Sequence, residues 1–369
     1  MKNIVIPDSL QITMDDLGWF CGEDGREKME PARAGVKRNH EEEDYEVVNE
    51  LGRRLGMKIN CAFMLGEWDM DNRLKNIPHL SPYGENWDNA SRFDKEKAKR
   101  FVDIINTSPY IDIAHHGLHH SYYIPGNVYS NSDFYFLKDG KWNEAPEDEV
   151  RMKIEAFYDI YELNGFKKEI TSFVPPNFTY HLNHLSPVLK EYGILYLSTI
   201  FDRIEPKTEN LSSVEIENDI ITVDRTNNLI DWDEMESNPL SLPDTVGIFG
   251  CHWANICHKD PKKNYTLVDN WVKYFERCKG NFGTILSTGI SFHATQLLYK
   301  KYSAVKNENG VFAIDVSGVP KHKGMEDSFY ISSEEVLENY SGCELEIYEK
   351  QKNFINYKVT PKGNILKFK

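Results

Sequence analysis

The sequence predicts an α/β protein built on a distorted parallel (β/α) barrel of about seven strands, followed by a small β-rich module. Between about residues 10 and 290, short apolar strand-like runs alternate with helical stretches, which is the order found in parallel sheets. Acidic and histidine side chains end several different runs, and this favours a barrel over an open sheet. After about residue 300, mainly short strand-like runs between polar turns remain.

The expected barrel strands are short and apolar, and the expected helices are longer and amphipathic. The strands cover residues 10–14, 58–65, 110–114, 171–174, 194–198, 219–223, 246–249 and 283–287. The helices cover residues 41–55, 93–105, 147–163, 185–192 and 264–278. In the first helix, Val48, Leu51 and Leu55 follow helical spacing. Gly56 follows as a C-terminal stop.

Two long segments interrupt this series. Residues 70–92 are rich in Asn, Pro, Asp and Gly, which predicts a loop. Residues 120–146 also read as a loop and carry many Tyr and Phe side chains. A loop of this length in a compact domain is typical of a binding lid, although the same aromatic side chains equally suit packing of the lid onto the barrel.

The chain beyond the barrel is expected to form a separate module. Its strand-like runs cover residues 311–316, 328–331, 343–348, 354–359 and 365–368, and a weaker helical pattern covers 333–340. We therefore predict a barrel domain over residues 1–300 and a β-rich module over residues 301–369.

Composition and charge exclude several classes of protein. The chain has 369 residues, of which 40% are hydrophobic and 27% charged, as in a globular protein with a sizeable core. Its net charge of −15 argues against nucleic-acid or anionic-membrane partners, which are bound through clustered Lys and Arg. The six cysteines include no C-x-x-C pair, and no apolar run suits a signal peptide or a membrane span. These features indicate a cytoplasmic protein with reduced thiols.

Four histidines lie within six positions directly after an expected strand, residues 110–114. Two histidines four positions apart can bind one metal ion from the same side of a helical turn. The cluster offers two such pairs, His115 with His119 and His116 with His120. Imidazole nitrogen at this spacing suits zinc, so the cluster predicts a divalent metal site. A solvated histidine run is the plainer interpretation.

Three further motifs end strands before and after the histidines. They are Thr13-Met14-Asp15-Asp16, Phe173-Val174-Pro175-Pro176-Asn177-Phe178 and Gly250-Cys251-His252. With His116-Gly117-Leu118-His119-His120 in second place, the series resembles the polysaccharide deacetylase family, carbohydrate esterase family 4. That family's motifs run T-F-D-D-G, H-[ST]-x-x-H, R-x-P-x-G, an Asp-Trp element and L-x-H. The resemblance covers roughly residues 10–290 and implies the family's (β/α) barrel.

The resemblance implies a role for each motif. Asp16, His116 and His120 would hold a divalent metal, expected to be zinc, with positions left for water and substrate. Asp15 would act as general base, and His252 would return a proton to the leaving amine as general acid. The small Gly117 after His116 favours the 116/120 pair, while the 115/119 pair stays open.

The remaining expected site residues contact substrate or orient other groups. The backbone N–H of Asn177 would stabilise the oxyanion. Pro176, Trp253, Tyr122 and Tyr123 complete the expected oxyanion and substrate contacts. Asp231 and Trp232 are candidates for the family's orienting Asp-Trp element.

The sequence departs from the family pattern at the base's partner. Val174 stands where the family has the Arg that pairs with the catalytic base. Without that cation, Asp15 would be less well oriented, unless another residue supplies the charge.

Other interpretations of the motifs stay open. Asp15 and Asp16 would serve equally as a turn or helix cap. Cys251-His252 with Cys257-His258 would suit a structural zinc site. Pro175 and Pro176 would suit a strand terminator.

Taken together, the motifs predict a metal-dependent hydrolase that removes an acyl group from an N-acylated sugar or polysaccharide. A C–N hydrolase acting on another small amide is one alternative, because a fold does not determine a substrate. A non-catalytic carbohydrate-binding relative is the other. In each case the expected partner is a carbohydrate or a small amide.

Overall fold

A computed structural model places most of the chain. It describes residues 3–28, 30–33, 35–126, 130–205, 213–228, 235–236, 242–243, 246–280, 283–308 and 310–368.

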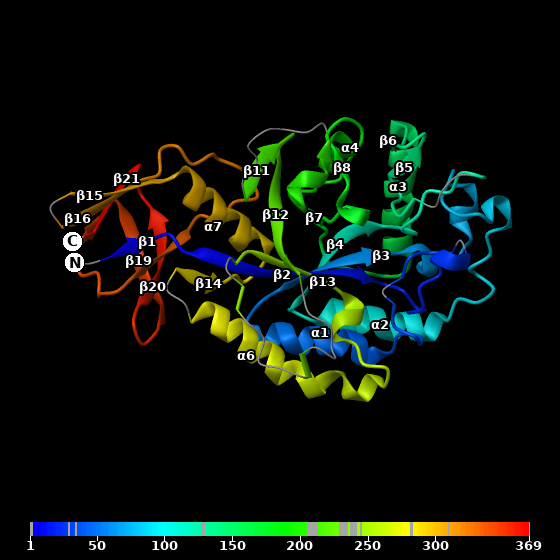
Figure 1. Ribbon diagram of the computed structural model, residues 1–369, viewed down its shortest axis with the longest axis horizontal. Helices are drawn as coiled ribbons and strands as arrows, with labels where there is room; N and C mark the ends of the chain where they lie inside the picture. Colours follow the sequence, from blue (N-terminus) through cyan, green and yellow to red (C-terminus); the bar gives the residue numbers. More distant parts are fainter. Residues whose placement is uncertain are drawn as a thin grey trace.

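A closed ring of parallel strands forms the centre of the molecule (Figure 1). Within the described residues it consists of β2 (Asp8–Leu17), β3 (Ile59–Met64), β4 (Ile111–Gly117), β7 (Ser172–Phe173), β9 (Tyr196–Thr199), β12 (Ile220–Asn228) and β13 (Ile248–His252). Each strand pairs in parallel with the next in this order, and β13 pairs with β2 to close the ring. The predicted parallel barrel of about seven strands is therefore confirmed.

Helices cover the outside of this ring. They are α1 (Glu42–Leu55), α2 (Lys95–Thr107), α3 (Glu147–Leu163), α4 (Leu185–Glu191), α6 (Val268–Lys279) and α7 (Ile290–Tyr302). In Figure 1, α1, α2 and α6 lie along one side of the barrel, and α3 and α4 along the other. Short 3₁₀ turns are η1 (Arg26–Lys28), η2 (Gly66–Trp68), η3 (Arg73–Asn76), η4 (Gly84–Asn86), η5 (Pro176–Phe178), η6 (Phe201–Arg203), η7 (Trp253–Ile256) and η8 (Pro261–Leu267).

Local sequence explains the helix that packs beneath the first strands. Helix α1 begins with a capping box in which the side chains of Glu41 and Asp44 each accept from the other's backbone N–H. It ends at Gly56, whose φ of 64° is left-handed and therefore suits glycine. Its apolar face, with Val48 and Leu51, is buried in the main core.

The strands outside the ring correct two expectations. Strand β14 (Thr284–Leu286) was expected within the barrel series. Among the described residues it pairs with the start of β2 alone, and β13 pairs with the rest of that strand. Residues 120–146 were expected to form a loop, but they contain the hairpin β5 (Tyr135–Lys138) and β6 (Lys141–Glu144). Three further strands are β8 (Tyr180–His181), β10 (Ile204–Glu205) and β11 (Val214–Glu217).

The C-terminal part forms two antiparallel sheets. One contains β1 (Ile4–Val5), β17 (Phe329–Ser333), β20 (Ile355–Pro361) and β19 (Cys343–Lys350). The other contains β15 (Ala304–Glu308), β16 (Val311–Asp315), β21 (Ile365–Phe368) and β18 (Tyr340–Ser341). Residues 333–340 are not helical, so the weak helical pattern there was misleading. The two sheets share an apolar core that also includes Ile4 and Ile6. The boundary at residue 300 stays a prediction, and the first residues of the chain pack with the last sheets.

Helix α7 lies between the barrel and these sheets, touching β2, β11 and β17 (Figure 1). The sequence did not predict it. Most of its residues are buried, including polar His293, Thr295 and Gln296, so it lacks the alternation of apolar and polar faces that marks a surface helix. Among the described residues, no helix is long and apolar enough to span a bilayer.

Candidate metal centre

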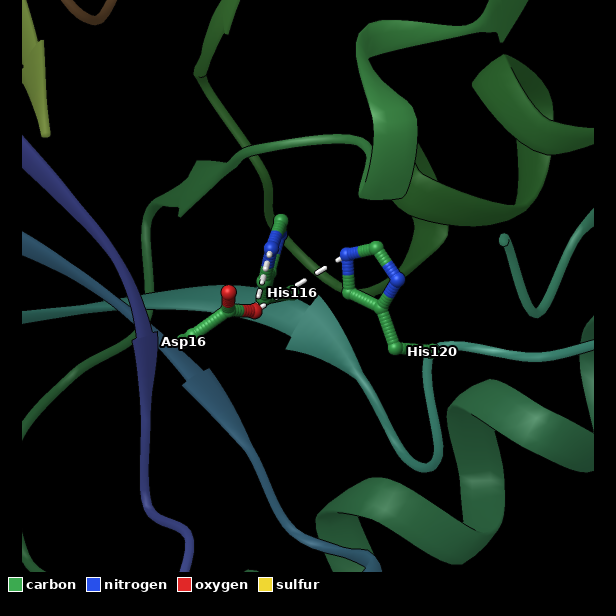
Figure 2. A group of neighbouring side chains, drawn as sticks. All are labelled: Asp16, His116 and His120. Atoms are coloured by element: carbon green, nitrogen blue, oxygen red, sulfur yellow. Dashed lines mark ion pairs between the residues drawn. The ribbon is translucent and has the colours of Figure 1, made fainter. Parts of the chain in front are cut away.

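Three side chains converge at the carboxyl end of the barrel strands (Figure 2). Asp16 comes from the end of β2, His116 from β4, and His120 from the turn that follows β4. Nε2 of His116 lies 3.6 Å and Nε2 of His120 lies 3.8 Å from Oδ1 of Asp16. All three residues are buried, and their candidate ligand atoms lie within 4.8 Å of one another. One carboxylate and two imidazoles in this arrangement suit a divalent cation such as zinc.

The hydrogen bonds of the two histidines leave the correct nitrogen available. Nδ1 of His116 lies 2.6 Å from the carbonyl oxygen of Val174, which accepts only, so the proton is on Nδ1. Nδ1 of His120 lies 2.5 Å from Oδ1 of Asn131. In the neutral form of each ring, a proton on Nδ1 leaves the lone pair of Nε2 facing Asp16, as in metal-binding histidines.

A bulge in β2 brings two adjacent carboxylates to one pocket. The register of β2 against β3 shifts between Met14 and Leu17, and Asp16 has a left-handed φ of 63°. In a regular strand, adjacent side chains point to opposite faces. Here Asp15 and Asp16 both line the same pocket. A left-handed non-glycine residue costs about 1–3 kcal/mol, and such strain is typical of functional sites.

The electrostatics of Asp16 also favour a cation. Its Oδ1 is buried and has no hydrogen-bond partner within the described part of the chain. Burial alone would raise the pKa of Asp16, but the neighbouring His116, His120 and His252 outweigh burial and hold that pKa well below its usual range. Asp16 is therefore a buried, ionised carboxylate with an oxygen available for coordination.

The other two histidines of the cluster lie elsewhere. His115 faces away from the barrel interior because it alternates with His116 along β4. Its ring packs 3.9 Å from that of Phe157, between centroids, and burial lowers the pKa of His115 to about 3. His119 lies edge-on to Trp87, and burial lowers its pKa to about 3 as well. Both are therefore neutral packing residues, and the structure brings the 116/120 pair to Asp16.

The partner of Asp15 comes from a strand that the motifs did not indicate. Nη1 of Arg225, on β12, donates to Oδ2 of Asp15 at 2.7 Å, and both side chains are buried. Arg225 crosses β13 at Gly250, where a Cβ would lie 2.5 Å from the guanidinium. Val174 contributes only its carbonyl oxygen, to His116. The cation expected from the proline motif is thus supplied by Arg225.

His252 and Asn177 stand at the rim of the same pocket. The side chain of His252 is 57% exposed, and its Nε2 lies 3.9 Å from Oδ2 of Asp16. A ring nitrogen of His252 accepts from the backbone N–H of Asn255, which fixes the ring's orientation. Asn177 and Phe178 have left-handed φ values of 56° and 58°, and both line the pocket. Pro176, beside them, is buried and does not line it.

The pocket has a volume of about 270 Å³, and one of its walls was not foreseen. This wall comes from the segment after β2, through Asp24, Arg26, Ala32, Arg33 and Gly35. Arg33 is held by Glu67, with Nη2 2.7 Å from Oε1. This segment carries no family motif, so nothing in the sequence marked it.

Several expected contacts are corrected by the structure. Trp253 is fully buried, stacks on His40 at 3.7 Å between ring centroids and donates from Nε1 to the carbonyl oxygen of Asp44, so it does not reach the pocket. The Tyr122 hydroxyl donates to Glu149, and the Tyr122 ring stacks on Phe136.

Neither Tyr122 nor Tyr123 lines the pocket, and Tyr122 packs its segment onto the protein. Asp231 and Trp232 lie outside the described residues. Asp69, which follows β3, is buried and accepts from Leu74 N and Trp87 Nε1.

A second group of potential ligands, His40, Asp44 and Cys257, contains a carboxylate that is already paired with an arginine. Arg38 donates to both oxygens of Asp44, at 2.7 and 2.8 Å, and a guanidinium in that position opposes a metal ion. Among the described residues, neither Cys251 nor His258 belongs to a group close enough to share one cation. The alternative zinc site of two Cys and two His is therefore not formed there.

Comparison with known proteins gives distant structural likenesses only. No family model matches the sequence, and no curated protein matches it. A family 4 carbohydrate esterase from Streptomyces lividans, in complex with acetate, is 11% identical with a TM-score of 0.35, over 77% of this chain and 93% of that one. A putative polysaccharide deacetylase from Mycobacterium smegmatis is 13% identical with a TM-score of 0.38, over 80% of this chain and 93% of that one.

A mutant of a pseudoenzyme from the same esterase family, with restored activity, is 13% identical with a TM-score of 0.36, over 79% of this chain and 68% of that one. Because all these TM-scores are below 0.5, we base the fold on strand pairing and the site on its own geometry.

Proposed function

We propose that the protein is a metal-dependent hydrolase that removes an acyl group, such as acetyl, from an N-acylated sugar or polysaccharide. One observation carries the proposal. Three candidate ligands share a pocket with an Asp–Arg pair and a rim histidine. The ligand atoms of Asp16, His116 and His120 fit a divalent metal, most simply zinc. When bound, zinc supplies a Lewis acid and a more acidic water.

Asp15 is suited to take the proton from the attacking water. Its Oδ2 is held by Arg225, and its Oδ1 is buried with no hydrogen-bond partner among the described residues. The held oxygen fixes the orientation of the carboxylate, and the other is available to accept a proton in the pocket.

Two groups at the rim would handle the substrate's charges. His252 would give a proton to the leaving amine, because its Nε2 points toward Asp16 from the solvent side. The backbone N–H of Asn177, turned by its left-handed φ, would donate to the oxyanion that forms on the acyl carbonyl.

The first test is metal content. Wild type is expected to bind one divalent metal per chain, and the double variant His116→Ala, His120→Ala is expected to lose it. His115→Leu is the matched control, because both ring nitrogens of His115 lack hydrogen-bond partners in the described part of the chain. Stoichiometric metal in the double variant would refute the ligand assignment.

The second test is acetate release from N-acetylated oligosaccharides by the metal-loaded protein. Turnover supports the deacetylase, and turnover of small amides alone supports a different C–N hydrolase. Sugar binding without turnover supports the non-catalytic alternative. The intact Asp15–Arg225 pair supports catalysis over binding alone, because it orients the carboxylate that would take the proton from water.

A further inference from the structure

We propose that Asp133 holds the turn that carries His120 in its metal-binding geometry, and that the buried Lys153 holds Asp133 in place. This inference rests on the proposed function, because it assigns positioning residues to the same metal centre. Asp133 and Lys153 lie outside the motifs that the sequence offered.

The Asp133 carboxylate binds the backbone of the metal turn. Its Oδ2 accepts from Leu118 N at 3.0 Å and from His120 N at 3.3 Å, and its Oδ1 accepts from His119 N at 3.1 Å. Three successive N–H groups on one carboxylate form an anion-binding nest, which fixes the backbone around the anion. Asp133 thus sets the course of the chain from β4 to His120.

The turn could not keep this shape by itself. Gly117 has a φ of 124° and His120 a left-handed φ of 54°, and neither conformation is favourable for an ordinary side chain. A Cβ on residue 117 would collide with Oδ2 of Asp133. Glycine at this position therefore provides both the backbone conformation and the space for the carboxylate.

The segment that carries Asp133 also fixes the ring of His120. Asn131, two residues earlier, holds Nδ1 of that ring at 2.5 Å. His116 is held differently, because it lies within β4 and its ring is bonded to the carbonyl oxygen of Val174. His120, which lies outside the strand, is therefore held at two points by one short segment. Asp133 binds its backbone N–H, and Asn131 binds its ring.

Lys153, from helix α3, ties this segment to the outside of the barrel. Its side chain is fully buried, and Nζ donates to the carbonyl oxygen of Asp133 at 2.6 Å. Nζ also lies 4.1 Å from the centroid of the Tyr122 ring. Burial lowers the pKa of Lys153 to about 8, against the opposing effects of Asp133 and Glu149. A buried ammonium is costly unless it is paired, so its placement at Asp133 has a structural purpose.

Asp133→Asn tests the inference directly. The variant is isosteric, but its amide nitrogen opposes the N–H donors of the turn. We expect the metal dissociation constant, measured by competition with a chromogenic chelator, to rise by at least about 10-fold, as when the supports of metal ligands are removed. The visible spectrum of the Co²⁺-loaded protein is expected to change as His120 moves. Tyr122→Phe is the control, because it removes a hydroxyl that contacts Glu149 and His79 and keeps the ring beside Lys153, and it is expected to keep the dissociation constant within about 2-fold of wild type.

Lys153→Met provides a second variant if Asp133→Asn does not fold. Methionine has a similar length and removes the cost of a buried charge, while the carbonyl oxygen of Asp133 loses one hydrogen bond. We expect the metal dissociation constant of the folded variant to rise by about 3-fold or more, with a change in the Co²⁺ spectrum like that of Asp133→Asn, which a merely structural role would not produce. Folded variants with wild-type affinity and Co²⁺ spectrum overturn the inference and leave the proposed function standing. A wild type that binds no metal overturns both.

Discussion

At the scale of single residues, the candidate site depends on a buried ion pair between Asp15 and Arg225, which come from different strands of the barrel. Asp15 is buried with Arg225, which lies 210 residues away in the sequence. The guanidinium also lies 4.8 Å from the centroid of the Phe178 ring, at the wall of the pocket. Arg225 is therefore held from several sides, and its fork geometry orients the carboxylate in a way that a lysine would not reproduce.

Arg225→Met is expected to lower kcat/KM by about 100-fold, because small misplacements of a reacting group cost about this much. Arg225→Lys keeps the charge, and its kcat/KM is expected to lie between those of Arg225→Met and the wild type. The measurement is steady-state hydrolysis by folded protein with verified metal content, which both variants should retain. A kcat/KM within about 3-fold of wild type in Arg225→Met would contradict the role of the pair.

The sequence was informative for local features of the site and uninformative for distant ones. The order of motifs and the small residue after His116 indicated the pair of histidines that the structure brings to Asp16. Arg225 and Asp133 could not be anticipated, because their contacts depend on how strands and loops meet in space. The expected role of Trp253 failed because an aromatic residue beside a site histidine can equally face the core.

At the scale of elements, a buried carboxylate joins the first helix to the loops that follow β2 and β13. Asp44 is in the capping box of α1 and binds Arg38 and Asn264. Burial alone would raise the pKa of Asp44, but hydrogen bonds from Arg38 and His40 outweigh burial and hold that pKa well below its usual range. The folded state thus favours the ionised form of Asp44.

This preference predicts a pH-dependent stability. Because the pKa of Asp44 is lower in the folded than in the unfolded chain, its stabilisation is fully present above about pH 4 and is lost as the pH falls below that value. Asp44→Asn is expected to cost about 3 kcal/mol of unfolding free energy near neutral pH, as for a broken buried ion pair. Chemical denaturation at pH 7 and pH 3 checks this. The cost should shrink at pH 3, and an equal cost at both values would contradict the assignment.

Helices with a clear apolar periodicity were predicted well, and a helix that is buried on most sides was not. Helix α3 was expected over residues 147–163, where the structure has it. Helix α7 was missed because it is covered on most sides, so its sequence shows no solvent face. The β5–β6 hairpin was not predicted, because residues 120–146, which contain it, are rich in turn residues.

At the scale of the whole molecule, the barrel and the C-terminal sheets are joined by buried hydrogen bonds. Gln296 of α7 donates from Nε2 to the carbonyl oxygens of Pro7 and Tyr330, at 2.9 and 3.0 Å. Its Oε1 accepts from Tyr330 N at 2.9 Å. One amide therefore satisfies backbone groups of the chain's first segment and of β17.

Gln296→Ala is expected to destabilise the protein by about 2–4 kcal/mol, because it leaves several buried backbone groups without partners. Thermal unfolding followed by circular dichroism and by tryptophan fluorescence measures this. Gln351→Ala is the control, because Gln351 is half-buried and lies outside this hydrogen-bond network. It should change the unfolding free energy by less than about 0.5 kcal/mol. A Gln296→Ala variant as stable as wild type would show that this amide does not join the two parts.

If the proposed metal binds in the pocket, the strained backbone around it would link the stability of the protein to the supply of that metal. Asp16, His120 and Asn177 all hold left-handed conformations, and each is a cost that the folded chain carries. A bound ion at 1,000 times its dissociation constant would add about 4 kcal/mol to stability, more than offsetting one such conformation. A cell short of the metal would then hold fewer copies of the protein, because the empty form opens more often to proteases. The amount of this protein in the cell would then rise and fall with the concentration of the available metal.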